Sequence, residues 1–179
     1  MTDDVITQLA AARTNPSIIM VVGVGGAGGN AVNHMWNLGI KGVDFMVCNT
    51  DQQALDKSPV ELKVRLGSEG LGAGNDPENG RKAAIESLDV VRQRFEASGT
   101  KMVFITAGMG GGTGTGASPV IAKLAKEMGM LTVGIVTSPL AVEGKIRYEQ
   151  AFRGIEELRQ NVDSLLIINN ENILEIYGR

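Results

Sequence analysis

Short apolar runs alternate with amphipathic segments along most of the chain. Six runs are apolar at nearly every position and rich in β-branched residues, a pattern typical of parallel strands that are covered on both faces. We therefore expect strands at Ile18–Val22, Asp44–Asn49, Val60–Leu66, Met102–Thr106, Leu131–Thr137 and Ser164–Asn169.

Helical periodicity occupies the segments between these runs. It is clearest at Pro77–Ala97, Ala117–Glu127 and Tyr148–Val162. Asp76 before Pro77 is a helix-start signal, because aspartate caps a helix well and proline is preorganised for the first helical position. The alternation of strands and helices predicts an α/β fold with a doubly wound, mainly parallel sheet of about six strands. Such a sheet binds its ligand at the carboxyl ends of the strands.

Glycine is concentrated rather than spread along the sequence. The chain has 24 glycines, and fifteen of them lie in three clusters, at 23–29, 67–74 and 108–116. Each cluster follows an expected strand, so all three are expected at the carboxyl edge of the sheet. Evenly spread glycine would indicate disorder, whereas this distribution predicts three loops that face a ligand.

The third cluster, Gly108 to Gly116, has the composition of a phosphate site. It contains six glycines together with Thr113 and Thr115, and it lies between an expected strand and an expected helix. Without Cβ atoms the backbone can approach an anion closely, and the N–H groups and dipole of the helix favour negative charge there. The threonine hydroxyls can donate to phosphate oxygens or help to hold magnesium. A merely flexible turn would not require two regularly placed threonines.

The first cluster leaves a second hypothesis open. Gly23, Gly25 and Gly28 fit the G-x-G-x-x-G dinucleotide fingerprint, and Asp44 or Asp51 could serve a ribose. An NAD-dependent oxidoreductase is therefore the alternative, although a dinucleotide fold needs only one such loop and no acid/base pair for hydride chemistry is evident. A domain of this fold that no longer binds nucleotide and acts as an interaction module is a third possibility.

Residues Gly110 to Gly116 read G-G-G-T-G-T-G, the signature of the tubulin/FtsZ family. From about Ile18 to Arg179 the chain resembles the nucleotide-binding half of FtsZ, the GTPase that polymerises into the bacterial division ring. Other segments match FtsZ in order and approximate spacing, namely Gly23 to Asn30, Asn49-Thr50-Asp51, Gly70 to Gly74, and Glu143 to Arg147.

The resemblance implies that GTP or GDP is the ligand, with Mg²⁺ carried on the phosphates. It places Glu143 and Arg147 at the sugar and phosphates, and Asn170 at the guanine edge. The residues expected to contact nucleotide are Gly25, Gly26, Ala27, Gly28, Gly29, Asn30, Gly72, Ala73, Gly74, Gly108, Gly110, Gly111, Gly112, Thr113, Gly114, Thr115, Gly116, Glu143, Arg147 and Asn170.

Simpler interpretations of several of these residues remain open. Asn30 could satisfy its own helix turn, and Glu143 with Arg147 could form an exposed i,i+4 ion pair. Asn170 could be a cap, and Thr50 or Asp51 could cap the next short helix. The loop before Gly70 also departs from the family, because only two residues separate Gly67 from it. Discrimination between GTP and GDP therefore does not carry over by resemblance.

Composition limits the partners. A net charge of −3 and a pI near 5.2 argue against binding nucleic acid or a membrane surface. No apolar run approaches the roughly 20 residues of a spanning helix, so no direct membrane insertion is expected. The single cysteine, Cys48, fits a reducing cytoplasm, and neither it nor His34 has partners at metal-ligand spacing.

The expected organisation is a flexible N-terminal arm at residues 1–16 and a GTP-binding domain at 17–179, ending in a short helix. The core helix and the C-terminal domain of FtsZ are not expected within this sequence. In FtsZ the water-orienting acidic residues lie on a loop of the neighbouring subunit, so no catalytic residue is assigned. The resemblance implies a homopolymer at the cytoplasmic division site, with division-ring accessory proteins as partners, and poor hydrolysis of GTP by this chain alone.

Overall fold

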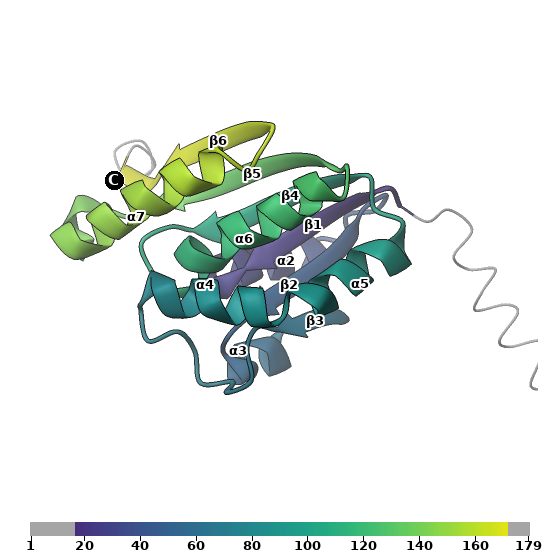
Figure 1. The fold of residues 1–179 in the computed structure, drawn as a ribbon, viewed down its shortest axis with the longest axis horizontal. Helices are drawn as coiled ribbons and strands as arrows, with labels where there is room; N and C mark the ends of the chain where they lie inside the picture. The colour runs from purple at the N-terminus through teal and green to yellow at the C-terminus, as the bar shows by residue number, and fades with distance from the viewer. Residues whose placement is uncertain (1–16, 172–179) are drawn as a thin grey trace, which may run out of the picture.

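The computed structural model describes residues 17–171 and contains one sheet of six parallel strands in the order β3-β2-β1-β4-β5-β6 (Figure 1). This confirms the predicted α/β, doubly wound architecture. The strands are β1 (Ile19–Val24), β2 (Asp44–Asn49), β3 (Leu62–Arg65), β4 (Met102–Gly108), β5 (Leu131–Ser138) and β6 (Ser164–Asn169). The helices are α2 (Gly25–Asn37), α3 (Gln52–Lys57), α4 (Pro77–Glu86), α5 (Leu88–Ser98), α6 (Thr113–Glu127), the 3-10 turn η1 (Ala141–Glu143) and α7 (Lys145–Arg159).

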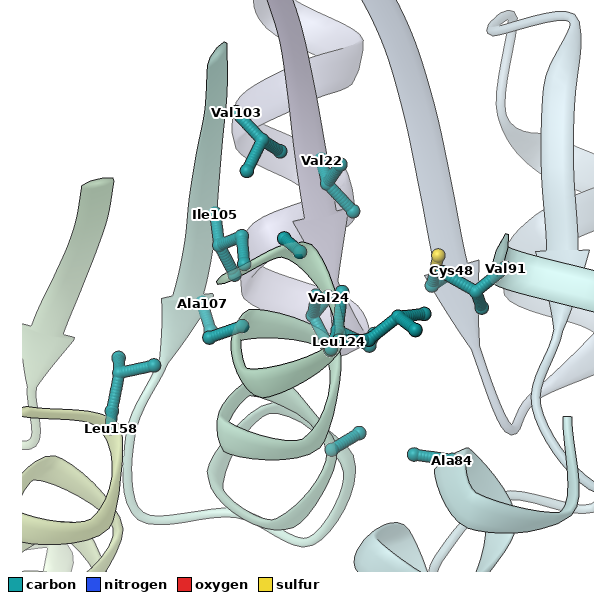
Figure 2. Packing of buried hydrophobic residues seen from close by; sticks show 14 of the residues in the cluster. Val22, Val24, Cys48, Ala84, Val91, Val103, Ile105, Ala107, Leu124 and Leu158 are labelled. Atoms are coloured by element: carbon teal, nitrogen blue, oxygen red, sulfur yellow. The ribbon is translucent and has the colours of Figure 1, made fainter. Parts of the chain in front are cut away.

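The sheet lies between two helical layers. Helices α4, α5, α6 and α7 cover one face, and α2 lies behind β1, β2 and β4 on the other (Figure 1). The alternation of side chains along β1 serves both layers, because Val22 and Val24 belong to the larger core and Val21 packs with Val32 in the smaller one. Figure 2 shows part of the larger core, to which Val24 of β1 and Leu124 of α6 both belong.

Two segments of the sequence prediction lie wholly or largely outside the described residues. They are the flexible arm at 1–16 and the short C-terminal helix, of which only the first two residues, 170 and 171, are described. Within residues 17–171, none of the helices has the length and apolar character needed to span a membrane.

The predicted helix Pro77–Ala97 is two helices, and Ser87 separates them. Asp76 caps the first as predicted, accepting a hydrogen bond from the N–H of Glu78 at 2.9 Å. The Ser87 hydroxyl accepts from the Gly67 N–H at 2.8 Å and donates to the Arg65 carbonyl at 3.3 Å. The break therefore ties these helices to the end of β3, a tertiary contact that helical periodicity does not reveal.

Two of the three helices that follow glycine clusters begin within the cluster itself. α6 starts at Thr113 rather than Ala117, and α2 starts at Gly25 directly after β1. Part of the first and third glycine clusters is therefore the first helical turn and not a loop, whereas α4, after the second cluster, begins at Pro77 as predicted. α7 also begins earlier, at Lys145 rather than at Tyr148.

The edge strand β6 differs from the other apolar strands. It was expected to be covered on both faces, yet Leu166 is 55% exposed and Ile167 is 39% exposed. β6 pairs only with β5, and α2 covers the sheet over β1, β2 and β4. An apolar run alone does not distinguish a central strand from an edge strand, which explains the difference.

Cys48 is buried near the end of β2, and its burial raises the pKa of the thiol from 9.0 to about 12. The thiolate is therefore disfavoured in the folded state. We expect iodoacetamide at pH 8 to leave the native protein unmodified and to label Cys48 in urea, as mass spectrometry would show. Because the pKa of the Cys48 thiol is higher in the folded protein, burial of the protonated thiol contributes fully to stability below pH 9. This contribution is lost as the pH rises towards 12.

Candidate functional site

A cavity of about 380 Å³ opens at the carboxyl edge of the sheet. It lies where β1, β4 and β5 end and where α2 and α6 begin. Its volume falls in the range of small-molecule sites. The amino ends of α2 and α6 both reach its wall, and a helix start carries free N–H groups and partial positive charge. The cavity is therefore suited to an anionic ligand.

The structure brings many of the predicted contact residues together on this wall. They come from the start of α2, the segment from the end of β4 to the start of α6, the loop before α4, and the segments after β5 and β6. The predicted residues that line the cavity are Gly26, Ala27, Ala73, Gly108, Gly111, Gly112, Thr113, Gly114, Glu143, Arg147 and Asn170.

The other predicted residues lie elsewhere. Gly25, Gly29 and Asn30 line a separate groove between α2 and α3, which Gly26 also borders. Gly28 is buried, and a Cβ there would meet the carbonyl of Thr106. Gly72 and Gly74 belong to the loop between β3 and α4 but do not line the cavity, and Gly110, Thr115 and Gly116 are buried beside it.

Thr115 and Gly116 serve packing. The Thr115 hydroxyl accepts a hydrogen bond from the Gly110 N–H at 2.8 Å, and the side chain is only 2% exposed. A Cβ on Gly116 would meet the carbonyl of Pro77, because α4 and α6 approach closely there. The sequence hypothesis that both threonine hydroxyls face a ligand therefore fits Thr113, which lines the cavity, and not Thr115.

Gly26 and Gly111 have no packing reason to be glycine. A Cβ on Gly26 would have no protein atom within 4 Å, and one on Gly111 would have its nearest neighbours at 3.7 Å. Neither residue has the positive φ that favours glycine. Both border the cavity, so the space that they leave open is continuous with it.

Glu143 and Arg147 form the ion pair that was the simpler interpretation of their spacing. An Arg147 guanidinium nitrogen donates to a Glu143 carboxylate oxygen at 2.9 Å, and the other oxygen accepts from the Leu140 N–H at 2.9 Å. The pair is partly exposed and contributes little to stability. It nevertheless holds both charged groups on the cavity wall.

Asp51 has the capping role that was left open. Its carboxylate accepts hydrogen bonds from the N–H groups of Gln53 and Ala54 at the start of α3. Gly23 lies within β1, and Asp44 lies at the amino end of β2, opposite the edge that holds the cavity. Neither Asp44 nor Asp51, the two candidates for a ribose contact in the NAD hypothesis, lines the cavity.

Sequence reasoning missed several residues of the wall. Thr137 and Ser138 end β5, and polar residues at the end of an apolar run were a usable signal. Asn75 adopts φ +60°, which asparagine tolerates better than most residues, and it follows the glycine run before α4. The other missed wall residues are Val24, Met109 and Pro139.

No cluster of three or more His, Cys, Asp or Glu side chains that could hold a metal occurs within residues 17–171.

The chain has a parallel, doubly wound sheet, and helix amino ends suited to an anion surround a cavity at its carboxyl edge. These features place it in the class of nucleotide-binding α/β domains. The GTPase domain of the tubulin/FtsZ family matches residues 18–178. The chain belongs to this family, which confirms the resemblance and does not support the oxidoreductase alternative.

Two curated relatives are cell division proteins named FtsZ. The chain is 54% identical to the one from Porphyromonas gingivalis over 165 residues, which is 90% of this chain and 36% of the relative. It is 52% identical to the one from Wigglesworthia glossinidia brevipalpis over 169 residues, covering 93% of this chain and 44% of the relative. The chain thus spans less than half the length of these relatives.

Solved structures agree. An empty FtsZ dimer from M. jannaschii superimposes with a TM-score of 0.88 at 40% identity, covering 98% of this chain and 52% of that one. CetZ2 from Haloferax volcanii, in a GTPγS-bound protofilament, gives 0.79 at 28% identity, covering 86% and 49%.

Proposed function

We propose that this domain binds GTP and GDP in the cavity at the carboxyl edge of the sheet. The observation that carries the proposal is the convergence of two glycine-rich helix starts on one cavity, in a member of a GTPase-domain family. Gly26 and Gly111 leave backbone open to the cavity, where N–H groups can approach phosphate oxygens without side-chain obstruction.

Each part of the wall suits a part of the nucleotide. The starts of α2 and α6, with the Thr113 hydroxyl, offer donors to phosphates, and Mg²⁺ would be carried on the phosphate oxygens. The Glu143 carboxylate can accept from ribose hydroxyls, and Arg147 can donate to sugar or phosphate oxygens. Asn170 borders the same cavity, where its amide can pair with the guanine edge.

Titration calorimetry of the purified chain tests the ligand. GTP and GDP are expected to bind, while ATP and NAD bind much more weakly, because the chain belongs to a family of GTPase domains. Binding of NAD with an affinity equal to that of GDP would contradict the proposal, and so would the absence of binding by any guanine nucleotide.

We further propose that efficient hydrolysis needs a second subunit. Phosphoryl transfer to water requires a group that orients the water. The only carboxylate on the cavity wall within residues 17–171 is Glu143, which is paired with Arg147. The 179-residue chain alone is therefore expected to bind GTP with little phosphate release and without long filaments. Phosphate-release and light-scattering assays test this, and sustained turnover by the isolated chain would contradict it.

The names of the relatives support a cellular role. FtsZ proteins are cell division proteins, and a CetZ2 relative is solved as a protofilament. We propose that the protein of which this domain is part forms a homopolymer in the cytoplasm at the division site, together with division-ring accessory proteins. Fluorescence imaging of the tagged protein in dividing cells tests this, and uniform distribution through division would contradict it.

A further inference from the structure

Thr50 lies at the end of β2 and does not line the cavity, yet its hydroxyl contacts a residue that does. The Thr50 and Thr113 hydroxyl oxygens are 2.6 Å apart, a short hydrogen bond between residues 63 positions apart in the sequence. Thr50 is 5% exposed, so water has little access to its side chain. Thr113 begins α6 and belongs to the cavity wall.

Either hydroxyl can be the donor of this hydrogen bond. Its direction decides whether the Thr113 hydroxyl offers a proton or a lone pair to a ligand in the cavity. If Thr113 donates to Thr50, its remaining lone pairs face the cavity and repel an anion. If Thr50 donates to Thr113, the Thr113 proton is free for a ligand oxygen. A hydroxyl that accepts one hydrogen bond becomes a better donor in another, so this direction also strengthens the contact with the ligand.

Thr50 is fixed by its backbone as well. The Thr50 carbonyl accepts a hydrogen bond from the Gly72 N–H at 3.1 Å, and the two residues after Thr50 also pair with the loop that follows β3. Asp51 forms an antiparallel bridge with Leu71, and the Gln52 N–H donates to the Gly70 carbonyl at 3.0 Å. The loop after β3 and the start of α6 are thus both held by one residue at the end of β2.

We propose that Thr50 is a positioning residue, which donates its hydroxyl proton to Thr113 and thereby aims the Thr113 hydroxyl at a phosphate oxygen of the bound nucleotide. The inference rests on the proposed function, because it needs an anionic ligand in the cavity. β-branching limits the rotation of both side chains, so the two-hydroxyl chain is preorganised before the ligand arrives.

The test is a double-mutant cycle measured by calorimetry with GDP. Thr50→Val keeps the shape and removes the donor, and it is expected to weaken GDP binding roughly 3- to 10-fold. Thr50→Ser keeps the hydroxyl and should bind nearly as the unaltered chain does. In a Thr113→Val background the Thr50→Val change should add almost nothing, because the residue through which Thr50 acts is already gone.

Thr132→Val is the matched control. Thr132 is fully buried and its hydroxyl donates to the Met130 carbonyl at 3.2 Å, at the opposite end of the sheet. Its loss should lower the melting temperature without changing GDP affinity. Thr50→Ala replaces Thr50→Val in the cycle if the valine variant does not fold.

Three results would overturn the inference. One is an equal loss of affinity from Thr50→Val with and without the Thr113 hydroxyl. Another is failure of Thr50→Ser to restore binding, and the third is unchanged affinity in Thr50→Val when Thr113→Val binds weakly. Failure of the unaltered chain to bind GDP would be a different outcome, since it would overturn the proposed function and remove the basis of this inference with it.

Discussion

Replacing Gly26 by alanine is expected to stabilise the fold and to weaken nucleotide binding. Gly26 lies in the first turn of α2, and alanine is the better helix former by up to about 1 kcal/mol. The added Cβ meets no protein atom, so the fold pays no packing penalty. The Cβ would instead occupy cavity space beside the backbone, where we propose that a phosphate oxygen binds. Losing one charge-assisted hydrogen bond corresponds to roughly a 10- to 100-fold loss of affinity.

The matched control is Gly29→Ala in the same helix. A Cβ on Gly29 also meets open space, but this residue borders the groove between α2 and α3 and not the cavity. Thermal unfolding without ligand and calorimetry with GDP separate the two variants. Unchanged GDP affinity in Gly26→Ala would show that no phosphate contacts this turn, and an equal loss in both variants would show that the effect is not local.

Among the substitutions considered, Gly116→Ala is expected to lower the free energy of unfolding the most. Gly116 packs against the backbone of α4, where its Cβ would meet the Pro77 carbonyl and lie 2.8 Å from the Arg81 nitrogen. Backbone atoms of a helix cannot rotate away as a side chain can, so α4 and α6 must separate. We expect a loss of about 3 kcal/mol or more in the free energy of unfolding.

Urea denaturation followed by circular dichroism measures this loss, again with Gly29→Ala as the control. The variant should lose nucleotide binding only to the extent that it unfolds, and saturating GDP should partly restore the folded population. A Gly116→Ala variant that unfolds at the same urea concentration as the unaltered chain would show that the two helices can separate at little cost.

The sequence predicted the sheet well because its strands depend on local composition. All six apolar runs are strands, and their order along the chain with intervening helices implied parallel pairing. What sequence did not reveal depends on contacts between distant segments. The break at Ser87 is fixed by its hydrogen bonds to Gly67 and Arg65, twenty or more positions away. The exposure of β6 follows from its place at the edge.

The position of the candidate site could be predicted from the sequence. Which motif residues line the cavity and which pack against the rest of the protein could not. Glycine clusters after strands placed the cavity at the carboxyl edge, where it lies. The same motif contains Gly111, which leaves space open to the cavity, and Gly116, which leaves space for a neighbouring helix. The sequence shows where a glycine lies. Only the fold shows whether the space beside that glycine is filled by a neighbouring part of the protein or is left open to the cavity. Thr50 escaped notice because its contact with Thr113 joins separate motifs.

Glycines that pack against backbone and glycines that border the cavity should differ in how readily they are replaced during evolution. In a lineage that kept this fold but no longer bound nucleotide, selection would still hold Gly28 and Gly116, because a side chain there collides with backbone. Gly26 and Gly111 would be released, and the stabilising effect of alanine would favour their replacement. Substitution at these two positions in an otherwise intact sequence would therefore mark a descendant that has become a nucleotide-free scaffold.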